Sequence, residues 1–210
     1  MISAIILAAG QSRRMKKDGH PNKLLLQIGD KKVIEHTADH VLASRVDEVY
    51  AVLGCKHDPL FDLLQPKGIH IVINDARDQG QSTSLVAGLN AIHPSSEGAI
   101  FFLADQPFVA PGLINHILKV FQDKKDQKCQ VIYPVYQGVR GNPVLFHRDL
   151  FPSLRAVRGD KGGRSIIESL NKQDICQVVT RHKGVLMDID TLEDYKQALA
   201  YYRQGPMMDE

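Results

Sequence analysis

Apolar positions along the chain follow two different spacings. Buried β-strands are predicted where apolar residues run together or alternate, at 3–9, 48–54, 69–75, 98–105 and 129–136. Helices are predicted where apolar residues recur every three or four positions, at 31–44, 58–65, 82–92 and 111–123. Because strands and helices take turns, the pattern predicts an α/β fold, a Rossmann-like three-layer sandwich with a mainly parallel sheet and helices on both faces.

The pattern becomes less regular after residue 136. It predicts a short strand at 141–146, a loop entering a helix at 159–170, a strand at 175–180 and a last helix from Thr191. No linker, repeat or low-complexity segment interrupts the sequence. We therefore expect a single domain over residues 1–204, followed by a flexible tail at 205–210.

Composition argues against several classes of protein. The 210 residues are 43% hydrophobic and carry a net charge of +2, so bulk charge predicts neither nucleic acid nor a membrane as a partner. Tryptophan is absent, and no apolar run approaches the roughly 20 residues of a membrane span. The three cysteines, Cys55, Cys129 and Cys176, lack a paired spacing, which argues against a disulfide framework and favours a reducing cytoplasm.

The first predicted strand leads directly into small and then basic residues, in the sequence AIILAAGQSRRM (4–15). Ligands of parallel sheets bind beyond the carboxyl ends of the strands, where the nearly bare backbone of Ala8, Ala9 and Gly10 can approach them closely. Five cations follow within eleven residues, namely Arg13, Arg14, Lys16, Lys17 and Lys23. Exposed amides beside clustered cations are typical of a polyphosphate site, although a solvated basic loop would have the same composition.

Two common phosphate motifs are missing from this loop. The sequence contains no GxxxxGK[ST], and no GxGxxG follows the first strand. A single glycine followed by arginines suits a nucleoside triphosphate better than a dinucleotide.

Two carboxylates stand where a metal ion would be useful. Asp105 ends the strongly apolar run FFLAD (101–105), at the same sheet edge as the first loop, and Asp190 lies in MDIDTLEDY (187–195). Beside phosphate-binding cations a carboxylate makes electrostatic sense if it holds Mg²⁺, which takes one or two carboxylates together with phosphates and water. The alternatives are that Asp105 caps the turn before Pro107 and that Asp190 or Thr191 caps the last helix.

These stretches resemble nucleotidyltransferases with the signature LAAGxSxRM…K, here LAAGQSRRM (7–15) followed by Lys23. Within that superfamily, which has the nucleotide-diphospho-sugar transferase type of fold, the chain is most similar to the molybdenum cofactor cytidylyltransferases, or MobA-like nucleotidyltransferases. Further matching segments are LADQP (103–107), GQSTSL (80–85), GNPVLF (141–146), GDKG (159–162) and DIDT (188–191). One departure is Lys16, which stands where the family has glycine, with a longer path to Lys23.

The resemblance implies a role for each matching residue. Ala8, Ala9 and Gly10 would line the nucleotide, and Arg14 and Lys23 would contact its phosphates. Asp105 would be the principal Mg²⁺ ligand and Asp190 the second. The remaining implied contacts are Gly80, Ser82 and Ser84 around base and ribose, and Asn142, Pro143 and the 159–164 loop facing the acceptor.

The resemblance thus implies a cytoplasmic, Mg²⁺-dependent enzyme that moves CMP from CTP to the phosphate of the molybdopterin cofactor and releases pyrophosphate. One alternative is transfer to another phosphate acceptor, such as a sugar phosphate or methylerythritol phosphate. Another is a non-catalytic protein that hands the cofactor to a molybdenum hydroxylase such as xanthine dehydrogenase. In each case the expected partners are small molecules and such a recipient enzyme, with no nucleic acid and no membrane.

Overall fold

An eight-stranded sheet forms the centre of the computed structural model, which describes residues 1–12, 14–15, 22–124, 129–159 and 162–205. The described strands, of which β2 and β3 lie outside this sheet, are β1 (Ile2–Leu7), β2 (Gln27–Ile28), β3 (Lys31–Lys32), β4 (Glu48–Leu53), β5 (His70–Ile73), β6 (Gly98–Leu103), β7 (Val131–Tyr136), β8 (Val139–Arg140), β9 (Val144–His147) and β10 (Ile175–Val179). The α-helices are α2 (Val33–Leu42), α3 (Leu60–Leu64), α4 (Gln81–Ala91), α5 (Pro111–Asp123), α6 (Phe151–Ala156), α7 (Arg164–Ser169) and α8 (Leu192–Arg203). Short 3-10 helices are η1 (Lys23–Leu25), η2 (Gln65–Lys67), η3 (Arg77–Gln79), η4 (Arg148–Leu150), η5 (Lys172–Asp174) and η6 (Lys183–Leu186).

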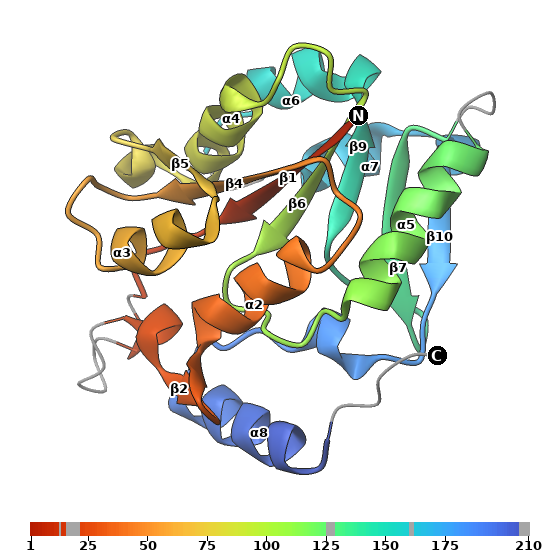
Figure 1. Ribbon diagram of the computed structural model, residues 1–210. Helices are drawn as coiled ribbons and strands as arrows, with labels where there is room; N and C mark the ends of the chain where they lie inside the picture. Colours follow the sequence, from red (N-terminus) through yellow and green to blue (C-terminus); the bar gives the residue numbers. More distant parts are fainter. Residues whose placement is uncertain (13, 16–21, 125–128, 160–161, 206–210) are drawn as a thin grey trace.

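The sheet has the order β10-β7-β9-β6-β1-β4-β5, with β8 paired to β7 (Figure 1). Strands β6, β1, β4 and β5 run parallel to one another, and β7 runs parallel to β10, so the predicted mainly parallel α/β sheet is confirmed. Strand β9 runs antiparallel between β6 and β7, with Val144 opposite Phe101. The start of β9 therefore lies at the sheet edge where β6 ends.

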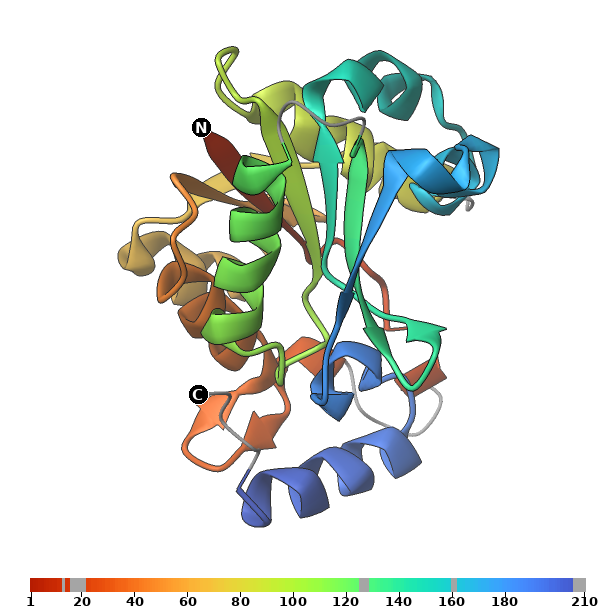
Figure 2. The ribbon, with the colours of Figure 1, turned by 90° about the vertical axis from the view of Figure 1, so that its right-hand side faces the viewer.

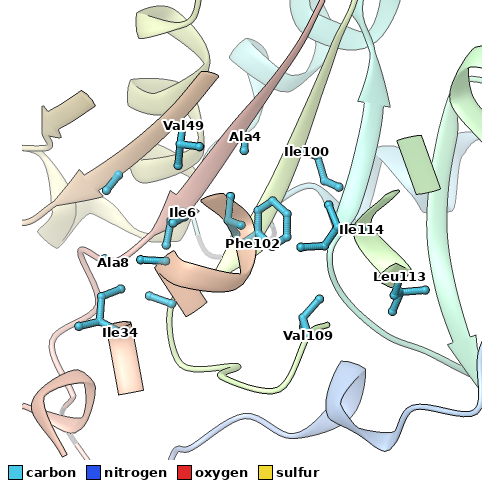
Figure 3. Close-up of a cluster of buried hydrophobic side chains, with 14 of the residues drawn as sticks. Ala4, Ile6, Ala8, Ile34, Val49, Ile100, Phe102, Val109, Leu113 and Ile114 are labelled. Atoms are coloured by element: carbon cyan, nitrogen blue, oxygen red, sulfur yellow. The ribbon is translucent and has the colours of Figure 1, made fainter. Parts of the chain in front are cut away.

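Both faces of the sheet are buried, because alternate residues of each central strand belong to different cores. In β1, Ala4 and Ile6 pack in the core under α2, α3 and α5, while Ile5 packs in the core under α4, α6 and α7. Figure 2 shows α5 and α6 on opposite sides of the sheet. Figure 3 shows the first core, where Ile34 of α2 and Ile114 of α5 approach β1 and β6.

The strands end earlier than the apolar runs predict. Strand β1 stops at Leu7 rather than at residue 9, and β6 stops at Leu103 rather than at residue 105. Ala8 and Ala104 remain buried, so they continue the apolar run although they have left the strands. Asp105, directly after Ala104, consequently lies just beyond the sheet edge.

The expectation that no cysteines pair is wrong. The sulfur atoms of Cys129 and Cys176 lie 2.17 Å apart, across a sequence separation of 47 residues. Cys129 comes two residues before β7 and Cys176 lies near the start of β10, so the parallel pairing of these two strands brings the cysteines to the same end of the sheet. Spacing along the chain carries no information about such a contact. Cys55 is a free thiol.

No α-helix in the described ranges is both long and apolar enough to cross a membrane.

Candidate active site

A cavity of about 710 Å³ lies at the carboxyl ends of the central parallel strands. Backbone and side chains of the loop after β1, the segment before α4, the end of β6 and the approach to α8 line it. Among the residues that the structure describes, its charged lining consists of three cations and four carboxylates: Arg14, Lys23, Arg77, Asp78, Asp105, Asp188 and Asp190.

The loop after β1 forms the floor of this cavity. The N–H of Ala8 donates to the carbonyl of Val52 over 2.9 Å, which continues the β1–β4 pairing one step past the strand. Ala8 and Ala9 are buried, whereas Gly10 is exposed with no atom near the position of a Cβ. Small side chains thus leave the backbone here open to a ligand.

The ammonium group of Lys23 lies between two carboxylates. Its Nζ donates to Asp105 and, over 2.6 Å, to Oδ1 of Asp190. Arg14 Nη2 lies 2.9 Å from the other oxygen of Asp190. Lys23 and Asp105 are only 12% and 17% exposed, so this is a half-buried cluster rather than a surface ion pair.

Backbone hydrogen bonds explain why Asp105 and Asp190 meet. The N–H of Ile189 donates to the carbonyl of Asp105 over 3.1 Å, joining the two segments directly. Thr191, and not Asp190, caps α8, because its hydroxyl accepts from the N–H of Asp194 over 3.2 Å. The carboxylate of Asp190 is therefore available to the cavity. Residues 188–190 form no strand, and both Asp188 and Asp190 line the cavity.

The pKa values of the two carboxyl groups are shifted in opposite directions. Burial raises the pKa of Asp105, and Asp190 and Asp188 add to this rise, which outweighs the lowering by Lys23. Burial also raises the pKa of Asp190, but Lys23 and Arg14 outweigh burial and the net shift is downward. Burial lowers the pKa of Lys23, whereas Asp105 and Asp190 raise it above its ordinary value.

The opposite end of the cavity is built by the segment before α4. Asn74, buried after β5, donates from Nδ2 to the hydroxyls of Thr83 and Ser84, each over 2.9 Å. Gly80 has φ 115° and ψ 167°, a conformation that a residue with a side chain rarely adopts. Gln11 donates to the carboxylate of Asp78, linking the loop after β1 to η3.

Most of the predicted site residues line this cavity: Ala8, Ala9, Gly10, Arg14, Lys23, Gly80, Ser84, Asp105 and Asp190. Ser82, Asn142 and Pro143 do not. Ser82 is buried and its N–H donates to Gly159 over 3.0 Å, so it holds a neighbouring loop in place. Asn142 and Pro143 lie just before β9, at the same sheet edge but outside the cavity lining.

Some of the sequence predictions fall outside the described residues. These are the cations Arg13, Lys16 and Lys17, residues 160–161 of the acceptor loop, and residues 206–210 of the tail.

The residues fit a magnesium ion. Two carboxylates converge on one point, and a cationic group, the Lys23 ammonium, already lies at that point. Carboxylates outnumber cations in the described lining, so a polyphosphate would need a further cation to bind there. Within the described part of the chain no three His, Cys, Asp or Glu side chains form a metal cage, which agrees with an ion that keeps water and substrate phosphates as its other ligands.

Sequence reasoning missed Gln11, Asn74, Arg77 and Asp78 as site residues. The only signal was their position: Gln11 follows the first strand, and the other three follow the strand that ends at Ile73. A turn-forming segment such as NDARDQG reads equally well as an ordinary loop.

Comparison with known proteins places the chain in a family. The MobA-like NTP transferase domain matches residues 4–175. The Bacillus subtilis purine catabolism protein PucB is 26% identical, over 91% of this chain and 92% of that protein. A probable molybdenum cofactor guanylyltransferase of Natranaerobius thermophilus is 26% identical over 95% of this chain and 96% of its own length. Rv0371C of Mycobacterium tuberculosis H37Rv, solved with manganese, superimposes with a TM-score of 0.78 at 26% identity, over 95% of this chain and 97% of that one. The chain belongs to the family of MobA-like NTP transferase domains.

Proposed function

We propose that this protein transfers CMP from CTP to the phosphate of the molybdopterin (molybdenum) cofactor, with pyrophosphate as the second product. The observation that carries the proposal is the Lys23 ammonium held between Asp105 and Asp190, beside a loop whose backbone is open to a nucleotide. The molybdenum cofactor guanylyltransferase among the relatives supports the acceptor.

The reaction joins two anions. A phosphate oxygen of the acceptor attacks the α-phosphorus of the nucleotide, the bond to the bridging oxygen breaks, and pyrophosphate leaves. The protein's task is to align the two anions and to neutralise the charge that grows on the leaving group.

Residues of the cavity divide this task. Asp105 and Asp190 would hold Mg²⁺, which supplies positive charge to the phosphates when bound. With the carboxylates holding a metal ion, the Lys23 ammonium would be free to contact the phosphates. Arg14 neutralises a second phosphate from the exposed side of the cavity, and the backbone at 8–10 positions the nucleotide.

For the nucleotide we propose CTP over GTP. The proposal rests on the alanine of LAAG, because the resemblance links this sequence to cytidylyl transfer and LAGG to guanylyl transfer. Ala9 lines the cavity and is 6% exposed, so its methyl group takes up space at the floor that a glycine would leave open. Guanylyl transfer is the second candidate, because a full-length relative carries that name.

The test is a matrix of four nucleoside triphosphates against molybdopterin cofactor, a sugar phosphate and methylerythritol phosphate, read as pyrophosphate release. The proposal expects release with CTP and molybdopterin cofactor. Faster release with GTP would mean that GTP, and not CTP, is the nucleotide donor. Release with another phosphate compound would mean that this compound, and not molybdopterin cofactor, is the acceptor. Binding of the cofactor with no release would favour an accessory role.

The recipient of the product is proposed to be a molybdenum hydroxylase of the xanthine dehydrogenase kind. Similarity to a purine catabolism protein supports this, because xanthine is a purine. The reaction uses only small molecules and takes place in the cytoplasm.

A further inference from the structure

Arg77 is a cation of the cavity to which the reaction above gives no role. It begins η3, is half-buried and lines the cavity. It comes after β5, whereas Asp105 comes after β6, which is three strands away in the sheet. Its neighbour Asp78 accepts a hydrogen bond from Gln11. Within the described ranges, no carboxylate lies within 4.0 Å of the Arg77 guanidinium as an ion-pair partner.

The end of β4 is shaped to receive this side chain. A Cβ on Gly54 would lie 2.0 Å from Arg77 Nη1 and 2.9 Å from both its Cδ and its Cζ. Gly54 does not have a positive φ, so its backbone conformation does not itself call for glycine. Gly54 is buried because the arginine crosses it. The missing side chain is thus explained by the guanidinium group that takes its place.

The order of the strands locates Arg77 relative to the phosphates. Asp105 follows β6, the 8–12 loop follows β1, and Gly54 follows β4, which are consecutive strands of the sheet. Neighbouring strands are roughly 4.8 Å apart, so Gly54 lies on the order of 10 Å along the edge from the strand that carries Asp105. The cavity that holds Lys23 and Asp105 continues to Arg77, so a nucleotide with its phosphates at Lys23 has room for its nucleoside in that direction.

We infer that Arg77, seated over Gly54, contacts the base of the bound nucleoside triphosphate. This inference rests on the proposed function, because it takes the phosphates to lie at Lys23. A guanidinium is planar, weakly hydrated and able to stack on an aromatic ring, and it donates hydrogen bonds at its edge. Arg77 therefore supplies affinity for the nucleoside rather than charge for the phosphates.

Binding of CTP and of inorganic tripolyphosphate, measured by calorimetry, separates the two roles. In Arg77→Ala the dissociation constant for CTP should rise roughly tenfold, while that for tripolyphosphate should change less than about twofold. Arg77→Lys should resemble Arg77→Ala, because it keeps the charge and loses the plane. Gly54→Ala should also weaken the binding of CTP and not that of tripolyphosphate, because the new methyl group displaces only the flexible end of the Arg77 side chain.

The matched control is Arg155→Ala, which removes an exposed arginine on α6 that donates from Nε to Asn90 over 2.9 Å and does not line the cavity. It should leave both ligands unaffected, and melting curves should show all four variants folded. Equal weakening of CTP and tripolyphosphate in Arg77→Ala, or full affinity in Arg77→Lys, would overturn the base contact and make Arg77 a phosphate residue.

The two proposals can fail separately. Unchanged CTP affinity in Arg77→Ala would overturn the base contact and leave nucleotidyl transfer standing. Selective loss of CTP affinity in a protein that transfers nothing to molybdopterin cofactor would support the base contact and overturn the proposed reaction.

Discussion

Replacing Lys23 with methionine removes the ammonium group while keeping an unbranched side chain. Asp105 (17% exposed) and Asp190 (27% exposed) then share no cation, and Arg14 remains on Asp190 alone. Removing one partner of a buried ion pair costs about 3–5 kcal/mol. Because these carboxylates keep some contact with water and Arg14 stays, we expect the free energy of unfolding at pH 7 to fall by about 2 kcal/mol.

Urea unfolding followed by circular dichroism measures this loss. The difference in the free energy of unfolding between Lys23→Met and the unmutated protein should become smaller as the pH falls from 7 toward 4. The reason is that Asp105, whose pKa is already raised, takes up a proton in the folded variant. Added Mg²⁺ should stabilise Lys23→Met more than the unmutated protein, since no ammonium competes for the carboxylates.

Lys31→Met is the control for this experiment. Lys31 is 45% exposed and shares Asp39 with Lys67, so its loss should leave the free energy of unfolding nearly unchanged. The reasoning would be refuted if Lys23→Met had the same free energy of unfolding as the unmutated protein at pH 7 and gained no stability from Mg²⁺. The ammonium group would then not be compensating the charge of the two carboxylates.

Three further outcomes are expected. Asp105→Asn should fold and bind CTP but release pyrophosphate about a hundredfold more slowly at saturating Mg²⁺, as when one preorganised electrostatic group is removed; near-normal turnover would make Asp105 a turn cap. Ala9→Gly should bring the rates with GTP and CTP closer together; an unchanged ratio would remove the methyl group as the cause. Burial, with a smaller contribution from His36, lowers the pKa of His40, so the unfolded chain takes the proton first and stability falls as the pH drops below about 6.5. His40→Gln should flatten this fall in Tm between pH 7 and pH 5, and parallel curves for the two proteins would contradict it.

Much of the fold could be predicted from spacing alone, because the elements are strongly periodic. The helix predicted at 111–123 matches α5 residue for residue, since Pro111 begins it and its apolar stripe faces the sheet. The direction of β9 could not be predicted. Four apolar residues read the same in either direction, and only the turn through β8 shows that the chain comes back antiparallel.

The candidate site was predictable where a residue directly follows a strand. Asp105 and the 8–10 loop are such cases, and both line the cavity. The contact of Lys23 with both carboxylates was not predictable, since its partners lie 82 and 167 residues away in sequence. The place of the Arg77 side chain could not be predicted from the sequence, because it depends on the absence of a side chain at Gly54, in another part of the chain.

The hydrogen bond from Ile189 to the Asp105 carbonyl has a consequence for how the protein is made. Every described strand of the sheet lies before residue 180, so the sheet can pair before the segment that carries Asp190 has left the ribosome. Asp190 arrives only afterwards, when the segment before α8 docks against the end of β6. A nascent chain can therefore have its sheet paired and still lack half of its candidate metal site until the segment before α8 docks.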